Sequence, residues 1–182
     1  RYIRFNPYME QRAVCALVPK ENQSNSPLSE TKLLLGIHIR HGDKYPSRYY
    51  IETKVFLPYV KTFLQMYPIN GLVYIATDSS KAWSEIERTW PVSKILRQPF
   101  VQGASPNRTA AFALGLAPHR TNIEALTDIR ALSKCHYLLH GWSAMTEAAL
   151  YLNPRLVGFD LEDEDEPMNV TYFRKRISES IK

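Results

Sequence analysis

Cysteine and long apolar runs are scarce in this sequence, and their scarcity disfavours several classes of protein. Cys15 and Cys135 are too few for a disulfide scaffold, and no Cys-x-x-Cys or Cys/His spacing typical of a structural zinc site occurs. No stretch approaches the roughly 18 apolar residues needed to span a bilayer. The first residues, RYIRFNPYMEQR, also lack the apolar core of a signal peptide. We therefore expect a chain of this composition to fold around an ordinary hydrophobic core.

Acidic residues are sparse outside one short segment. The chain has 23 Lys and Arg against 18 Asp and Glu, and six of those acids lie in residues 160–166 (DLEDEDE), which leaves 12 acids elsewhere. A basic body suits an anionic ligand such as a nucleotide diphosphate, a nucleic acid or a phospholipid surface. The basic residues are dispersed and form no nucleic-acid recognition pattern, so we expect no nucleic-acid partner. Asp163 and Asp165 resemble a metal-binding DxD pair, but the flanking acids favour a solvated loop.

Short apolar runs alternate with amphipathic segments after a polar stretch at residues 20–32. Buried strands are predicted at 33–39 (LLLGIHI), 71–77 (GLVYIAT) and 135–141 (CHYLLHG), and weaker strands within VSKILR and RLVGF. Helices are predicted at 54–67 and 80–90, after a capping box formed by Thr121 and Glu124, and from Ser143 to Asn153. Strands that alternate with helices predict a doubly wound α/β fold with a mostly parallel, Rossmann-like sheet.

The apolar spacing also predicts which face of each helix is buried. The first helix should bury Val55, Tyr59, Phe63 and Met66, the second Trp83, Ile86 and Trp90, and the third Ile123, Leu126, Ile129 and Leu132.

Three strand ends carry polar residues that can act on an anionic ligand. Ligands of open α/β sheets bind beyond the carboxyl ends of the strands, so the loops that begin at Arg40, Asp78 and Trp142 should share one edge. Arg40 is the main candidate, because a guanidinium can grip diphosphate oxygens bidentately and stabilise negative charge as a sugar–phosphate bond breaks. A surface salt bridge is the alternative for this arginine. Ser143 adds a hydroxyl at a helix N-terminus.

The neighbours of Arg40 each have a functional and a structural interpretation. His38 should point to the face opposite Ile37 and Ile39, either as a ligand contact or as a buried core histidine. His41 could bind phosphate or face solvent in a loop. Gly42 could admit a ligand close to the backbone or simply form a turn. Lys44 would contribute only a positive charge near the site, without a specific contact.

Three ordered motifs carry a resemblance to a known family. Over about residues 33–159 the sequence resembles the α1,6-fucosyltransferase and nodulation-fucosyltransferase group. The motifs that match the signatures of this group, in order and spacing, are GIHIRHGDK, YIATDSS and DIRALSKCHYLLHGWSAMTEAALYLN. The resemblance implies the donor-binding, C-terminal half of a GT-B enzyme that takes fucose from GDP-fucose with inversion and without a metal or other cofactor. It further implies that Arg40 holds the β-phosphate, and that Asp78, Asp128 and Ser143 belong to the donor or catalytic site. A solvated helix face is the alternative for Asp128.

The sequence departs from that group in two places. The second arginine of the first motif is His41 here, and the carboxylate expected four residues beyond the lysine falls on Arg48. The candidate bases for the acceptor hydroxyl are therefore Asp43 and Glu52. Asp43 would be held by Arg40 or Lys44, which favours its ionised form and lowers its basicity, so we predict Glu52. A glutamate placed at a helix N-terminus by the macrodipole is the alternative.

Two other functions fit the same residues. The run R-H-G-D-K-x-P at residues 40–46 is close to the R-H-G-x-R-x-P motif of histidine acid phosphatases, in which His41 would be the nucleophile. Lys44 replaces the second phosphatase arginine, and no later His-Asp pair could donate the leaving-group proton. A nucleotide- or glycan-binding module that has lost its base is the third possibility.

Chain length and sequons predict the context of the domain. Complete members of the resembling group are about twice as long, so we expect residues 1–32 to be an N-terminal segment and linker from a preceding acceptor-side domain, and 33–182 to be the nucleotide-sugar-binding domain. Three Asn-x-Ser/Thr sequons, at Asn22, Asn107 and Asn169, favour the secretory pathway and, with the family, the Golgi lumen. Membrane attachment would then need a segment outside this chain.

Overall fold

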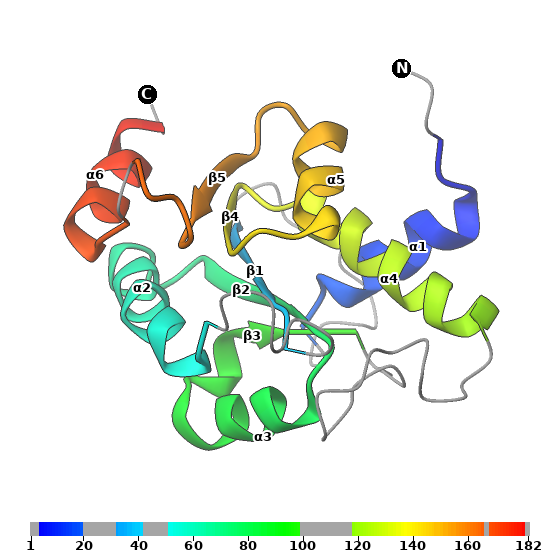
Figure 1. The fold of residues 1–182 in the computed structure, drawn as a ribbon, viewed down its shortest axis with the longest axis horizontal. Helices are drawn as coiled ribbons and strands as arrows, with labels where there is room; N and C mark the ends of the chain where they lie inside the picture. The colour runs from blue at the N-terminus through cyan, green and yellow to red at the C-terminus, as the bar shows by residue number, and fades with distance from the viewer. Residues whose placement is uncertain (1–3, 20–31, 42–50, 99–117, 166–167, 181–182) are drawn as a thin grey trace.

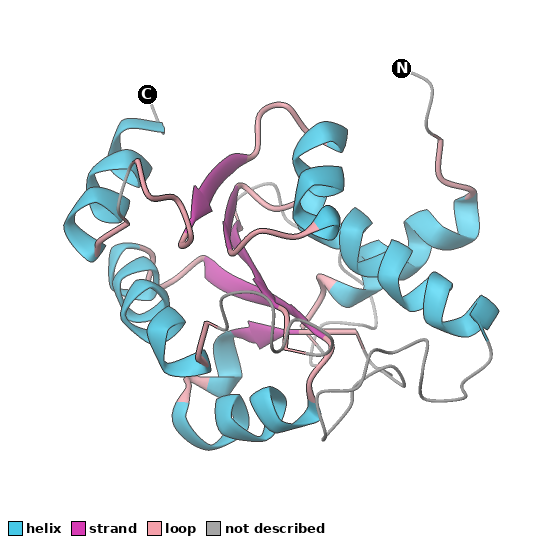
Figure 2. Ribbon diagram, in the orientation of Figure 1, coloured by secondary structure: helices cyan, strands magenta, loops and turns pink. Residues whose placement is uncertain are grey.

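A five-stranded, all-parallel sheet with helices on both faces forms the protein (Figures 1 and 2). The computed structural model describes residues 4–19, 32–41, 51–98, 118–165 and 168–180. The strands are β1 (Leu33–Ile39), β2 (Gly71–Thr77), β3 (Ile95–Leu96), β4 (Tyr137–His140) and β5 (Val157–Asp160). The helices are α1 (Pro7–Ala16), α2 (Thr53–Met66), α3 (Ser80–Thr89), α4 (Pro118–Ser133), α5 (Ala144–Leu152) and α6 (Val170–Ser180), with a short 3₁₀ turn at Val92–Lys94.

The strand order is β3-β2-β1-β4-β5, which confirms the predicted doubly wound fold. Strand β1 is central and pairs along its length with β2, and Gly36 faces both Tyr74 of β2 and Leu138 of β4. The predicted bounds of β1 and β2 match the structure. The third strand is shorter than the predicted 135–141, and VSKILR contributes only the two residues of β3.

Two apolar layers separate the sheet from its helices. On one face Ile37 and Ile39 pack with side chains of α2, α3 and α6, where the rings of Phe159 and Phe173 meet edge to face at 4.7 Å. On the other face Leu34 and Tyr74 pack with side chains of α1, α4 and α5. Figure 1 shows these three helices together on one side of the sheet. Because successive side chains of a strand alternate between faces, His38 points away from Ile37 and Ile39, as predicted.

The start of α4 differs from the prediction. The proposed capping box of Thr121 and Glu124 is wrong, because α4 begins at Pro118 and both residues lie inside it. Proline suits the first turn of a helix, where its missing N–H has no intrahelical partner. Glu124 is buried and lies 3.7 Å from the guanidinium of Arg120 one turn earlier.

The buried faces of two helices are also rotated from the predicted ones. In α4 Leu126 is exposed, whereas Thr127, Asp128 and Ala131 are buried, because polar side chains of α4 find hydrogen-bond partners in the interior. In α2 Val55 is exposed and Phe56 is buried in its place. A spacing rule that counts only apolar residues does not detect an inward face made partly of polar ones.

The N-terminal segment packs on the same sheet as the rest of the domain. Ala13 and Ala16 of α1, and Leu17 directly after it, are buried in the apolar layer that includes residues of α4. Glu10 accepts a hydrogen bond from Arg130 Nε at 2.7 Å and lies 3.1 Å from Lys134 Nζ. A preceding acceptor-side domain, joined through residues 1–32, stays a prediction. No helix in the described part of the chain is both long and apolar enough to cross a membrane.

Candidate functional site

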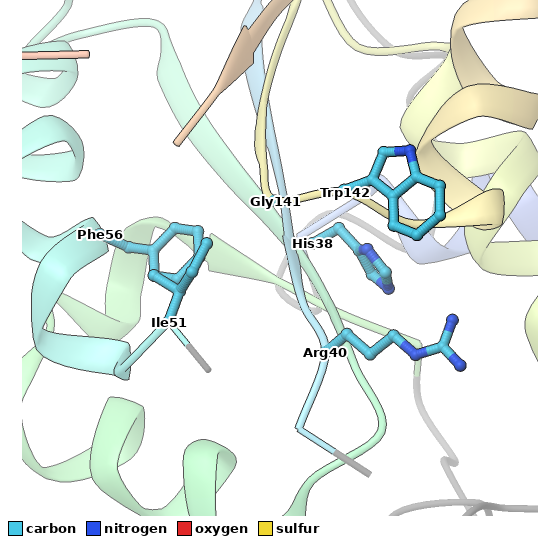
Figure 3. A pocket seen from close by; sticks show the side chains of 6 residues that line it. All are labelled: His38, Arg40, Ile51, Phe56, Gly141 and Trp142. Carbon is cyan, nitrogen blue, oxygen red and sulfur yellow. The ribbon is translucent and has the colours of Figure 1, made fainter. Parts of the chain in front are cut away.

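The loops after β1 and β4 meet at the carboxyl edge of the sheet, around a small hollow (Figure 3). The hollow is lined by residues that follow or end β1 and β4 and by the start of α2: His38, Arg40, Ile51, Phe56, Gly141 and Trp142. His38 lies near the end of β1 and Arg40 directly follows the strand, and Figure 3 shows both side chains extending to the same side. The structure thus brings together the predicted residues His38, Arg40 and Trp142.

Trp142 presents an aromatic surface to solvent at the rim of this hollow. Its side chain is 50% exposed, whereas Ile51 and Phe56 close the opposite side. An indole with one apolar face and one polar N–H suits contact with a sugar ring or a nucleobase. The hollow therefore combines a guanidinium with an aromatic rim, which is an arrangement suited to an anionic, partly planar ligand.

His41 and Asp78 fasten the loops after β1 and β2 to one another. The backbone N–H of His41 donates to Asp78 Oδ1 at 2.8 Å, and His41 Nε2 lies 2.8 Å from the carbonyl oxygen of Ile51. His41 is only 3% exposed, so the alternative of a solvent-facing loop histidine is wrong. These two predicted donor-site residues hold the backbone that carries Arg40 and Ile51.

Ser143 begins α5 and uses its hydroxyl as a helix cap. Its Oγ accepts a hydrogen bond from the backbone N–H of Met145 at 3.3 Å, and the side chain is buried. This confirms the predicted helix start at Ser143. The N-terminus of α5, with its partial positive charge, therefore lies directly after the rim residue Trp142.

Glu162 is a site residue that the sequence prediction missed. Its Oε2 accepts a hydrogen bond from the backbone N–H of Trp142 at 2.5 Å, and its own N–H donates to Asp160 Oδ1 at 2.9 Å. The acidic run was predicted to be solvated, which holds for Asp163, Glu164 and Asp165 but not for the half-buried Glu162. The strand order, which the sequence does not reveal, brings the residue just beyond β5 beside the loop after β4.

Asp128 lies in the interior rather than in the lining of the hollow. Its Oδ1 accepts hydrogen bonds from the Tyr74 hydroxyl and from Gln98 Nε2, both at 2.5 Å. Gln98 also donates to the carbonyl oxygen of Glu124 at 2.8 Å. Burial raises the pKa of Asp128 to about 7, against the lowering effect of the two hydrogen bonds. The solvated helix face considered for Asp128 is therefore wrong.

Glu52 stands at the N-terminus of α2 and does not line the hollow. Its carboxylate lies 2.5 Å from Lys54 Nζ, and both side chains are exposed. The hydrogen bond from Lys54 lowers the pKa of Glu52, which reduces its basicity. Its position matches the alternative of a helix N-terminal glutamate, and the catalytic role stays a prediction. Gly42, Asp43 and Lys44 lie outside the described residues.

Metal ligands do not gather in the described segments. No group of three or more His, Cys, Asp or Glu side chains in those segments could hold an ion. In the DxD pair the Asp165 N–H donates to Asp163 Oδ1 at 3.0 Å, which is a turn interaction between exposed residues. The expectation of a metal-independent site stays a prediction.

Comparisons with known proteins show a likeness in fold. No protein-family model and no curated protein matches the chain. Among solved structures, the fucosyltransferase NodZ from Bradyrhizobium superposes with a TM-score of 0.54 at 20% identity, over 93% of this chain and 48% of that one. A NodZ α1,6-fucosyltransferase crystal soaked with GDP-fucose gives a TM-score of 0.51 at 20% identity, over 91% and 48%.

These comparisons define the fold class. The chain has a Rossmann-like α/β fold with an all-parallel sheet, which is similar to the fold of part of a known fucosyltransferase. It is similar to part of NodZ in particular, and it spans about half the length of the NodZ chains that it matches.

Proposed function

We propose that the chain binds a nucleotide sugar, GDP-fucose, at the hollow beside Arg40, as the donor-side part of an inverting glycosyltransferase. The observation that carries the proposal is the position of Arg40 at the carboxyl edge of the central strand, next to the exposed ring of Trp142. Open α/β sheets bind nucleotides at this edge. One protein of similar fold was crystallised and soaked with GDP-fucose, which supports the choice of donor.

Arg40 would act on the diphosphate in the ground state and more strongly in the transition state. As the bond between the anomeric carbon and the β-phosphate oxygen breaks, GDP leaves with additional negative charge. A guanidinium that is already in place stabilises this charge without reorganisation. An acceptor hydroxyl of a glycan or protein would attack the opposite face of the sugar, which inverts the anomeric configuration.

The acceptor hydroxyl must lose its proton as it attacks. A carboxylate is the expected base, and Glu52 is the described candidate, with Asp43 as the alternative outside the described residues. Because Lys54 lowers the pKa of Glu52, the Glu52 carboxylate would have to exchange this partner for the acceptor hydroxyl in the reactive complex. Asp78, Asp128 and Ser143 would support the donor by fixing the loops and helices around it.

The geometry disfavours the phosphatase alternative. A nucleophilic histidine needs an accessible ring nitrogen, but the His41 ring is buried and its Nε2 contacts a backbone carbonyl. The binding-module alternative predicts the same nucleotide affinity without sugar transfer. Turnover with an acceptor therefore separates it from the enzyme.

Calorimetric titration with GDP-fucose, GDP-mannose and UDP-GlcNAc tests the proposal. We expect GDP-sugars to bind better than UDP-GlcNAc, and EDTA to leave the affinity unchanged. Arg40→Ala should weaken GDP-fucose binding by roughly 1.5–3 kcal/mol, the usual worth of a charge-assisted hydrogen bond. Arg88→Ala is the matched control, since it removes the same charge from an exposed position on α3. Equal affinity in wild type and Arg40→Ala would remove Arg40 from the site.

A further inference from the structure

Glu162 reaches from the acidic segment after β5 into the loop after β4. The segment carries four further acids, and its described members Asp163, Glu164 and Asp165 are exposed. Glu162 differs from them because its carboxylate accepts the backbone hydrogen bond of Trp142. The turn formed by Glu162 N–H and Asp160 Oδ1, at 2.9 Å, directs the side chain of Glu162 from its strand end.

Gly141 makes this contact possible. A Cβ atom at position 141 would overlap the Glu162 carboxylate and would lie 2.6 Å from Ile51 Cδ1. The loops after β1, β4 and β5 therefore meet at one backbone position that has no side chain. Ile51 is itself held by the contact between its carbonyl oxygen and His41.

We propose that Glu162 is a positioning residue that fixes the turn at Gly141–Ser143 and so holds the ring of Trp142 over the Arg40 hollow. Trp142 lies before the Ser143 cap of α5, so its backbone N–H is not part of the hydrogen-bond pattern of the helix and can be bound from outside it. A carboxylate satisfies such a donor with a strong, charge-assisted hydrogen bond. The turn is thereby fixed from one end by Glu162 and from the other by the Ser143 cap of α5.

The charge of Glu162 has the wrong sign for direct contact with a diphosphate. If Glu162 acted only through its field, removal of the charge would strengthen the binding of an anion. A positioning role predicts the opposite result, because a loosened Trp142 would contribute less to binding. The effect on nucleotide affinity rests on the proposed function, whereas the effect on the Trp142 backbone does not.

Two substitutions at one position separate these possibilities. Glu162→Ala removes the acceptor, while Glu162→Gln removes the charge and keeps an amide oxygen that can accept the Trp142 N–H. Glu164→Ala is the control, because it removes one exposed charge from the same segment. The measurements are the ¹⁵N–¹H spectrum of the labelled full chain, read at the Trp142 amide, and calorimetric titration with GDP.

We expect Glu162→Ala to move the Trp142 amide proton upfield, to reduce its protection from hydrogen exchange, and to weaken GDP binding about tenfold, equivalent to about 1.4 kcal/mol. Glu162→Gln should keep the Trp142 amide signal and the GDP affinity close to those of wild type. Glu164→Ala should change neither quantity. An unchanged Trp142 amide in Glu162→Ala would overturn the proposal, as would equal tightening of GDP by both Glu162 variants. Failure of the wild-type chain to bind GDP would defeat the proposed function, and the amide measurement would then decide the positioning role alone.

Discussion

The hydroxyl of Tyr74 donates a hydrogen bond of 2.5 Å to Asp128 Oδ1 across the interface between β2 and α4. Tyr74 is fully buried in the centre of the sheet, and its register partner Gly36 lies two residues before His38 on β1. The pair therefore lies on the face of the sheet that α1, α4 and α5 cover, which is also the face to which His38 points. Burial raises the pKa of both groups, so each keeps its proton to a higher pH in the folded chain than in the unfolded chain.

Asp128 should make the stability of the fold depend on pH. Burial raises the pKa of Asp128 in the folded chain to about 7, from an ordinary value near 3.8, so its contribution to stability is complete below about pH 4 and is lost as the pH rises through 7. Between pH 5 and pH 8 we expect wild type to lose about 2 kcal/mol relative to Asp128→Asn, which keeps the oxygen acceptor and cannot ionise. Urea unfolding across this range measures the difference. A difference that does not change with pH would show that Asp128 is ionised in the folded chain.

Gly141 should tolerate no side chain. Gly141→Ala would force a methyl group against Glu162 and Ile51, and overpacking of this kind costs about 1–3 kcal/mol. Gly158→Ala is the matched control, since its nearest neighbour would be the flexible end of Leu150 at 3.2 Å. Thermal unfolding of the two variants compares them. Equal stability would mean that the loops at position 141 move apart at no cost.

The proposed role of Glu52 as the catalytic base is tested by the rate of sugar transfer rather than by the affinity for the donor. With an acceptor that supports turnover, Glu52→Gln should slow the release of GDP from GDP-fucose at least about 100-fold and leave the affinity for GDP-fucose nearly unchanged. Lys54→Ala provides a second test, because loss of Lys54 raises the pKa of Glu52 and should move the acidic limb of the rate profile to higher pH. Full activity in Glu52→Gln would transfer the role of base to another group.

Asn169 combines a sequon with a helix cap, so two substitutions separate its functions. Its Oδ1 accepts a hydrogen bond from the Tyr172 N–H at 2.9 Å at the start of α6, whereas a glycan would attach to the exposed amide nitrogen. In a secreted form made in eukaryotic cells, both Asn169→Gln and Thr171→Ala should abolish a glycan at this site. Only Asn169→Gln should also destabilise the chain, by about 1 kcal/mol. Mass spectrometry and thermal unfolding give the two results. An unmodified Asn169 after secretion, together with unmodified Asn22 and Asn107, would contradict the predicted secretory location.

The sequence predicted the elements that depend on local pattern. Strands at 33–39 and 71–77 are continuous apolar runs with clear ends, and Ser143 is a strong helix cap, so their bounds follow from residue type alone. The common edge of Arg40 and Trp142 also followed, because parallel strands present their carboxyl ends on one side.

The parts that could not be predicted depend on contacts between distant residues. Gln98 accompanies Asp128 in the interior although 30 positions separate them, and no local pattern marks a glutamine that is 1% exposed. Glu162 contacts Trp142 across 20 positions, within a run whose composition indicates solvent exposure. The apolar spacing of α4 predicted that its polar residues face solvent, but Asp128 is buried. Its hydrogen-bond partners Tyr74 and Gln98 lie on β2 and after β3, and the local sequence of α4 does not reveal them.

The central place of β1 also constrains when the chain can fold during synthesis. One edge of β1 pairs with β2, and the other edge pairs with β4, which is synthesised much later. The hydrogen bond between Leu34 and His136, next to this second pairing, joins residues 102 positions apart. Until β4 leaves the ribosome, an apolar strand keeps one row of backbone groups open to pairing with other chains. Nascent chains would therefore be prone to aggregation over much of their synthesis, and a chaperone that covers residues 33–39 would protect them in that interval.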